Sequence, residues 1–408
     1  MAIGCWPFAY QQIHTIKSNR IITVILVIAD DFSGAAEMAG MAFRHGMRAG
    51  VSTQRAHRMR EGLLAMDTRT RMASSSRACQ AIHTLFQGID LDCVPWMFKK
   101  VDSVLRGHVR LEIENILSLT GLQRALLIPA NPSKGRVIVD GYYHIQGEPL
   151  HQTFFARDPH YPRQSSSMMD LIGGEGSYPV HLIEEPKNLN KEGILIPSIE
   201  DMSQVINWAN QAADSCLMAG GVDFFEALLK AKGSKPESCS ANPSPTNALP
   251  NQLFVCGSPG ALAAGRLNWC HQNGIPVHEC SSTWLASSDM APPKTWVEDA
   301  VGHLQKTGQC LVTTSAEPLN HLMSGKTVAS RLVQIVRHIM AGIRVDQVFV
   351  EGGETALELA DAMGWHDFRV TRASSEGIPE LAHHSNQLPT FIPKPGSYPW
   401  SDEWLVER

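Results

Sequence analysis

The sequence predicts an α/β protein of two domains, each a mainly parallel sheet flanked by helices, with an active-site cleft between the domains. Short apolar runs rich in β-branched residues alternate with segments of helical periodicity, which is typical of parallel strands buried on both faces. The 408 residues are enough for two or three domains. Residues 233–252 are poor in apolar side chains and rich in Pro, Ser and Asn, as linkers are. We therefore expect a tail over 1–20, a first domain over 21–232, a linker over 233–252 and a second domain over 253–408.

The composition argues against several classes of protein. The net charge of −5 is unlike that of a nucleic-acid-binding protein, which normally carries a basic face. No apolar run approaches the roughly 18 residues that span a bilayer. Residues 1–20 lack the basic start and the long apolar core of a signal peptide. The nine cysteines include no C-x-x-C pair, which indicates free thiols in a reducing compartment. We expect a cytoplasmic protein with neither nucleic acid nor a membrane as its partner.

The first strand is predicted over Ile21–Ala29, a nearly unbroken apolar run that ends on two carboxylates, Asp30 and Asp31. A segment of helical periodicity follows and stops at Gly46. A buried parallel strand would thus deliver both aspartates to its carboxyl end, where ligands bind in open α/β sheets. The alternative is that one aspartate caps the helix while the other faces solvent.

The next elements repeat this logic. Strands are predicted over 48–54 and 62–71, and the polar end of the second one contains Arg69. Taken alone, such an arginine is more often a surface residue. A capped amphipathic helix is expected over 74–88, followed by strand, turn and helix over 94–117.

The turn within 94–117 carries four polar residues that suit a small acidic ligand: Lys100, Asp102, Ser103 and Arg106. Arg106 could hold a carboxylate in a bidentate pair, and Lys100 adds a second positive charge. Asp102 and Ser103 can hydrogen-bond hydroxyl groups. The alternative is a helix N-cap with solvated ion pairs.

A further strand over 124–136 ends in a Pro/Gly-rich loop, and residues 137–162 are predicted to form a β-hairpin excursion. This excursion could reach a neighbouring domain or subunit, so a homodimer is one assembly that it allows. Arg157 and Asp158 are interpreted as a structural pair that locks the loop.

The second domain is expected to bind a phosphate-bearing ligand. Its first strand runs into a turn with Ser258, whose backbone lies where N–H groups point at a ligand. The strongest signal is 347–364, where a strand meets Gly352 and Gly353 before a helix that opens with Glu354 and Thr355. Plain βα turns without ligands are the alternative for both segments.

The Gly-Lys-Thr at 325–327 is not interpreted as a Walker A motif. That pattern needs a glycine at Asn320, and no strongly apolar strand immediately precedes it.

Four motifs together resemble the four-carbon acid sugar kinase family: ADDFSG at 29–34, KKVDSVLRGH at 99–108, PANPSKGR at 129–136 and GGETA at 352–356. Their order and spacing fit the chain from about residue 21 to its end. Val104, His108 and Glu354 depart from the family's usual threonine, asparagine and aspartate. The closing loop resembles the family's lysine-Pro-Gly-Gly-Phe-Gly segment in Lys394 and Gly396, whereas Ser397, Tyr398 and Pro399 replace its more flexible part.

The resemblance implies ATP-dependent phosphorylation of threonate, erythronate or their 3-oxo forms, with an N-terminal acid-sugar domain and a C-terminal nucleotide domain. It places the substrate among Asp30, Asp31, Arg69, Lys100, Asp102, Ser103 and Arg106, and the nucleotide among Ser258, Gly352, Gly353, Glu354, Thr355 and Gly396. Asp31 is our first choice, and Asp102 our second, for the carboxylate that orients or deprotonates the hydroxyl. Glu354 could hold Mg²⁺ directly or through water.

Two other functions compete with this interpretation. A binding protein that keeps the fold without catalysis would account for the altered closing loop and for Glu354. A dinucleotide-dependent oxidoreductase is less consistent, because the turn at 352–353 lacks the G-x-G-x-x-G pattern.

Overall fold

The structure is a computed structural model. It describes residues 23–54, 61–158, 160–212, 215–234, 249–257, 261–287, 289, 291–314, 325–383, 389–396, 398 and 400–405.

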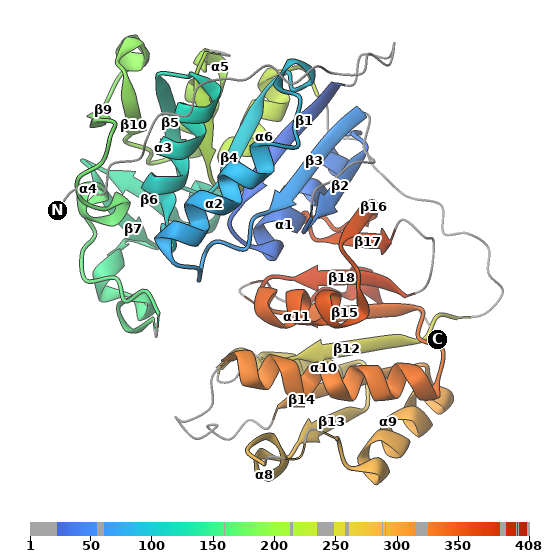
Figure 1. The fold of residues 1–408 in the computed structure, drawn as a ribbon. Helices are drawn as coiled ribbons and strands as arrows, with labels where there is room; N and C mark the ends of the chain where they lie inside the picture. Colours follow the sequence, from blue (N-terminus) through green and yellow to red (C-terminus); the bar gives the residue numbers. More distant parts are fainter. Residues whose placement is uncertain are drawn as a thin grey trace.

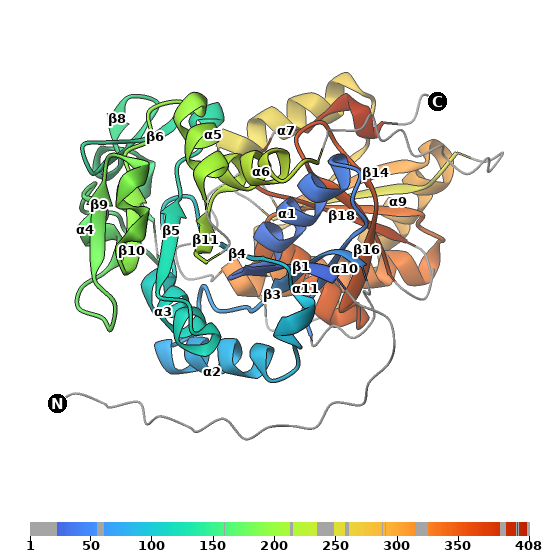
Figure 2. The same cartoon turned by 90° about the horizontal axis from the view of Figure 1, so that it is seen from above.

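The N-terminal region, residues 23–234, contains a parallel sheet covered by helices on both faces. Its strands are β1 (Thr23–Ala29), β2 (Ala49–Ser52), β3 (Glu61–Asp67), β4 (Met97–Lys100), β5 (Arg124–Ile128), β9 (Val180–Ile183), β10 (Gly193–Pro197) and β11 (Leu217–Gly220). They lie in the order β2-β3-β1-β4-β11-β5-β10-β9. The helices are α1 (Phe32–Arg44), α2 (Ser75–Phe86), α3 (Val109–Thr120), α4 (Met168–Ile172), α5 (Met202–Gln211) and α6 (Val222–Ala231). Helices α2 and α3 cover one face, and α1 and α6 cover the other (Figure 2).

The excursion after β5 is only partly a hairpin. Strands β6 (Arg136–Val139), β7 (Tyr142–Ile145) and β8 (Glu148–Pro149) form a small antiparallel sheet, which confirms the predicted hairpin there. The rest of the predicted segment is not β-structure, because two short 3₁₀ turns, Leu150–Gln152 and Phe154–Arg157, follow.

The C-terminal region, residues 249–405, is also mainly parallel. Strands β12 (Gln252–Cys256), β13 (Val277–Cys280), β14 (Gln309–Thr314), β15 (Gln347–Glu351) and β18 (Thr390–Lys394) are parallel, and β16 (Asp367–Ala373) and β17 (Pro379–His383) are antiparallel. The helices are α7 (Ala261–Gln272), α8 (Ser282–Leu285), α9 (Lys294–Thr307), α10 (Gly325–Gly342) and α11 (Gly353–Met363). Together the two regions confirm the predicted fold class.

The sheets of the two regions are joined into one sheet of 15 strands (Figure 1). Strand β16 pairs antiparallel with β2, with Phe368 opposite Val51. The first aromatic side chain of α1, Phe32, reinforces this junction: its ring centroid lies 5.9 Å from that of Phe368 and 6.0 Å from that of Phe391. The sequence analysis expected two separate sheets, so the bridging strand is a correction to that expectation.

The cores contain the predicted apolar runs. Leu26, Val27, Ile28 and Ala29 of β1 are buried. Cys256, at the end of β12, is also buried, and its Sγ accepts a hydrogen bond from Arg266. Among the described helices, none has the length and apolar character needed to span a membrane.

Candidate active site

Three carboxylates meet one arginine at the carboxyl edge of the N-terminal strands. Arg71 Nε lies 2.8 Å from Asp30 Oδ2, and Arg71 Nη1 lies 2.7 Å from Asp31 Oδ2. The same Nη1 lies 3.6 Å from Asp102 Oδ1. These residues follow β1, β3 and β4, which are neighbours in the order β3-β1-β4. Adjacent parallel strands therefore bring residues that are distant in sequence to one edge, as predicted for the aspartates.

The backbone holds this cluster in place. Asp31 is the N-cap of α1, and its Oδ1 accepts a hydrogen bond of 3.0 Å from the Gly34 N–H. The N–H groups of Thr70 and Arg71 both donate to the Asp30 carbonyl at 3.1 Å, so the turn after β3 lies against the end of β1. Asp30 itself is 3% exposed. The capping alternative is thus correct for Asp31, but Asp30 faces Arg71 rather than solvent.

The three carboxyl groups differ in proton affinity. Burial raises the pKa of Asp31, and the negative charge of Asp30 raises it further. Arg71 lowers the pKa of Asp31 but does not cancel these two effects. Burial also opposes ionisation of Asp30, but Arg71 outweighs it and leaves that pKa below its ordinary value. At Asp102, Arg71 and Arg106 overcome burial and hold the pKa well below its ordinary value. Asp31 is therefore the one member of the three with a raised pKa.

Arg106 is occupied by protein carboxylates. Its Nε and Nη2 donate to Asp102 at 3.0 and 2.8 Å, and its Nη1 donates to Asp158 at 3.1 Å. The predicted bidentate grip on a substrate would therefore have to replace these contacts. Asp158 also accepts backbone N–H groups from the loop, whereas Arg157 is exposed. The predicted Arg157–Asp158 pair is replaced by Arg106–Asp158.

Lys100 and Ser103, two of the residues expected to bind the substrate, lie next to the cluster in the turn that carries Asp102. Lys100 is buried and donates to the Val101 carbonyl at 3.0 Å. A methyl group placed on Gly34 would lie 3.7 Å from Lys100 Nζ and 2.6 Å from Asp31 Oδ1, so this ammonium is close to Asp31. The Ser103 hydroxyl accepts a hydrogen bond from Arg136.

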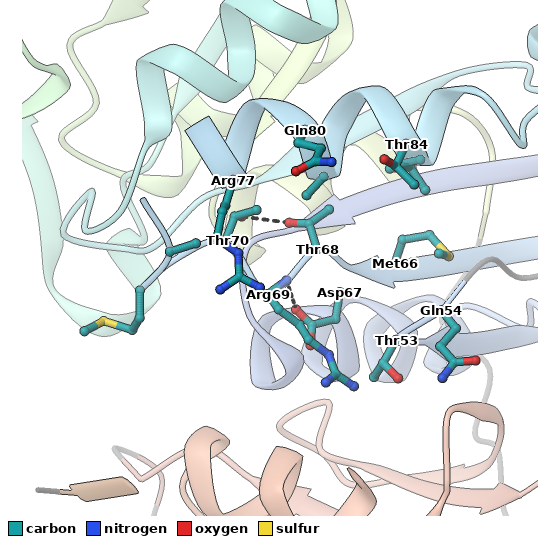
Figure 3. A pocket seen from close by; sticks show the side chains of 14 residues that line it. Thr53, Gln54, Met66, Asp67, Thr68, Arg69, Thr70, Arg77, Gln80 and Thr84 are labelled. Atoms are coloured by element: carbon teal, nitrogen blue, oxygen red, sulfur yellow. Dashed lines mark hydrogen bonds between the residues drawn. The ribbon is translucent and has the colours of Figure 1, made fainter. Parts of the chain in front are cut away.

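Arg69 does not join the cluster. Its backbone is left-handed, with φ of 54°, and its guanidinium forms a bidentate pair with Asp361 of α11, with both contacts at 2.7 Å. Arg69 lines a cavity of about 530 Å³ between the end of β3 and α2 (Figure 3). Asp67 also lines this cavity; it accepts the Arg69 N–H at 2.8 Å, and burial raises its pKa to about 7.

The glycine turn of the C-terminal region lies directly against the acid cluster. Gly352 has a φ of 97°, which favours glycine, and its N–H donates to the Lys394 carbonyl at 2.9 Å. A methyl group on Gly353 would lie 2.4 Å from Ser33 Oγ and 3.5 Å from Asp31 Oδ2. The start of α11 therefore faces the start of α1.

The remaining predicted nucleotide residues surround this turn where the structure describes them. Buried Thr355 has its Oγ1 3.1 Å from where a Gly257 methyl group would lie. Gly396 follows Lys394, whose ammonium lies 3.2 Å from Glu351, immediately before the turn. Glu354 is exposed on the first turn of α11. Ser258 lies outside the described residues, as do Ser397 and Pro399.

Arg71 is the residue that the sequence analysis missed. Arg69 and Arg71 lie two positions apart in the same polar turn, and no sequence motif indicates which of them contacts the aspartates. The left-handed backbone at Arg69 turns its side chain toward the other region and leaves Arg71 with the aspartates. Tyr161 of the excursion donates to the Arg71 carbonyl, which places the excursion at the site as well.

Each of the two regions matches the model of a known domain family. A sequence model described as a sugar-binding N-terminal domain matches residues 25–220, and one described as a nucleotide-binding C-terminal domain matches residues 253–398. The chain belongs to the four-carbon acid sugar kinase family, which confirms the resemblance.

Three relatives show the range of names in this family. A D-threonate kinase of Salmonella typhimurium is 22% identical and covers 87% of this chain and 90% of its own. A D-erythronate kinase of Heliobacterium modesticaldum is 24% identical, with 83% and 85% covered. A 3-oxo-tetronate kinase of Pseudomonas fluorescens is 28% identical, with 91% and 93% covered.

A solved structure shares the fold. The structure described as a putative tRNA synthase from Salmonella typhimurium has a TM-score of 0.70 at 15% identity and covers 92% of this chain and 96% of its own. At this identity the likeness concerns the fold alone.

Proposed function

We propose that this protein is an ATP-dependent kinase that phosphorylates a hydroxyl of a four-carbon sugar acid of the threonate, erythronate or 3-oxo-tetronate type. Family membership and the names of the relatives support the reaction class. The N-terminal region binds the sugar acid, the C-terminal region binds ATP, and the boundary between them lies in 233–252. Cys216, Cys270, Cys280 and Cys310 are buried thiols, which supports a cytoplasmic location. A homodimer stays a prediction.

One observation carries the proposal: the glycine turn before α11 lies against Asp31. A helix N-terminus offers unpaired N–H groups to a phosphate, and glycine lets a phosphate approach the backbone. Phosphoryl transfer needs an acceptor hydroxyl held in line with that phosphate. The approach of Gly353 to Asp31 brings a phosphate-binding element and a hydroxyl-binding carboxylate to one place.

The pKa values of the carboxyl groups suggest a different role for Asp31 than for Asp102. Asp31, whose pKa is raised, is the better proton acceptor and orients the hydroxyl. Asp102 has a strongly lowered pKa, so it is a poor base and serves as a fixed hydrogen-bond acceptor. Lys100 supplies the positive charge for the substrate carboxylate, and Arg71 and Arg106 keep Asp30 and Asp102 ionised.

A magnesium ion would arrive with ATP, and Glu354 offers one exposed carboxylate for it beside the turn. Mg²⁺ is usually held by one or two carboxylates together with phosphate oxygens and water. Among the described residues, no group of three or more His, Cys, Asp or Glu side chains could hold a metal ion by itself. Glu354, which is exposed on the first turn of α11, is the carboxylate that would hold the ion. The bound Mg²⁺ would neutralise negative charge on the phosphates.

A screen for ADP release tests the proposal. Purified protein is given Mg²⁺·ATP with D-threonate, L-threonate, D-erythronate or their 3-oxo analogues. We expect acid-dependent ADP release with at least one of them, and its loss in Asp31→Asn. Binding of an acid and of ATP without ADP release would instead support a non-catalytic binding protein with this fold.

A further inference from the structure

The closing loop of the C-terminal region reaches into the N-terminal region through Tyr398. The Tyr398 hydroxyl contacts Glu37 of α1 and Lys134 of the loop after β5. Lys134 Nζ also lies 4.1 Å from the centroid of the Tyr398 ring, within cation–π range. One side chain from the nucleotide half thus contacts an acid and a base of the sugar-acid half.

Glu37 connects this contact to the proposed substrate site. Its Oε1 lies 3.3 Å from Lys134 Nζ, and its Oε2 lies 3.6 Å from Lys100 Nζ. The Glu37 side chain is 13% exposed and that of Lys100 is 8% exposed, so water screens the pair weakly. The position of the Lys100 ammonium, which is close to Asp31, therefore depends on where the Glu37 carboxylate is held.

The other end of Tyr398 connects to the glycine turn. Its carbonyl accepts a hydrogen bond from Lys394, which in turn pairs with Glu351. Glu351 is the last residue of β15 and directly precedes Gly352. A continuous series of polar contacts runs from the proposed phosphate-binding turn through Tyr398 and Glu37 to Lys100.

We propose that Tyr398 and Glu37 are positioning residues for the sugar-acid substrate: the Tyr398 hydroxyl fixes Glu37, and Glu37 fixes Lys100. The acid site is complete only when Tyr398 of the nucleotide half contacts Glu37 of α1. This inference rests on the proposed kinase function for the identity of the acid, while the contacts themselves do not depend on it.

Tyr398→Phe removes the hydroxyl and keeps the ring over Lys134. Loss of one hydrogen bond of this kind corresponds to about a 2- to 10-fold effect. We expect the KM for the sugar acid to rise by that factor, with the KM for ATP unchanged. The matched control is Tyr142→Phe, on an exposed tyrosine of β7. An acid KM in Tyr398→Phe equal to that of the control would overturn the inference.

Hydrogen–deuterium exchange gives a readout without turnover. In the absence of any ligand, Tyr398→Phe should exchange faster than wild type and Tyr142→Phe over residues 131–136, because Lys134 loses a partner. Unchanged exchange there would contradict the inference. If the wild-type protein releases no ADP with any of the acids, the proposed function fails, and the exchange result alone decides whether Tyr398 holds this loop.

Discussion

At the scale of single residues, the site is organised by charge balance. Arg71 is shared by three carboxylates, and Arg106 by two. Burial raises the pKa of Asp31 and outweighs the effect of Arg71 there, whereas at Asp30 and Asp102 the arginines outweigh burial. The structure thereby distinguishes two aspartates, Asp31 and Asp102, that the sequence alone could only rank.

Asp31→Asn keeps the shape of the side chain and removes its basicity. We expect kcat to fall by roughly 10²- to 10⁴-fold, with Mg²⁺·ADP still raising the melting temperature. Asp102→Asn should lower the melting temperature more than Asp31→Asn does, because it removes the buried carboxylate that pairs with Arg71 and Arg106. Steady-state kinetics and thermal melts of both variants decide this. A fully active Asp31→Asn beside an inactive Asp102→Asn would assign the base role to Asp102.

Asp67 should give the protein a pH-dependent stability. Its pKa rises from 3.8 to about 7 on folding, so the folded state holds an extra proton between those values. Protonation of Asp67 therefore contributes at most about 4 kcal/mol to the free energy of unfolding. This contribution is fully present below about pH 4 and is lost as the pH rises through about 7.

Asp67→Asn stays uncharged at every pH. Its free energy of unfolding should therefore fall less than that of wild type between pH 5 and pH 8. Urea titrations at both pH values measure the difference, and Asp299→Asn on α9 is an exposed control. Parallel pH profiles for wild type and Asp67→Asn would show that Asp67 is already ionised at pH 5.

At the scale of elements, the candidate site residues lie at strand ends and helix starts. The sequence could predict this because a β-branched run ending in carboxylates, or in two glycines before a helix, is a local pattern. It could not predict that Gly353 approaches Ser33, because that contact joins residues 320 positions apart. Nor could it separate Arg69 from Arg71, since the difference lies in one backbone dihedral.

Gly353→Ala should impair the approach of α11 to α1. The new methyl group would lie 2.4 Å from Ser33 Oγ, closer than any relaxed contact. We expect a lower kcat than wild type in ADP release. Ser33→Ala removes that hydroxyl, so the double variant should recover part of the rate. If Ser33→Ala fails to rescue Gly353→Ala, the two helix starts do not meet during turnover.

At the scale of the whole molecule, the regions are tied by a shared sheet and by ion pairs. Strand β16 pairs with β2, and Arg69 pairs with Asp361 across the junction. The sequence predicted the fold class correctly. It missed the connection between the regions because pairing between β2 and β16 depends on residues more than 300 positions apart, which no local periodicity reports.

The Arg69–Asp361 pair should be measurable as a coupling between regions. Both side chains are about one-third exposed, so the pair is worth about 1 kcal/mol or less. Asp361→Arg alone places two arginines together and should lower stability, whereas the swap Arg69→Asp with Asp361→Arg should recover part of the loss. A double-mutant cycle from urea unfolding measures the coupling. Strictly additive effects would show that the contact does not form in solution.

The central claim is that ATP and a sugar acid meet between the regions and that the phosphoryl group moves to the acid. Phosphorus-31 NMR tests it directly on wild-type protein with Mg²⁺·ATP and each of the four-carbon acids. The account predicts that the γ-phosphate signal of ATP falls while a phosphomonoester signal of equal area appears, only with an accepted acid and not with Asp31→Asn. Conversion of ATP to ADP and inorganic phosphate alone, or no change with any of the acids, would contradict it.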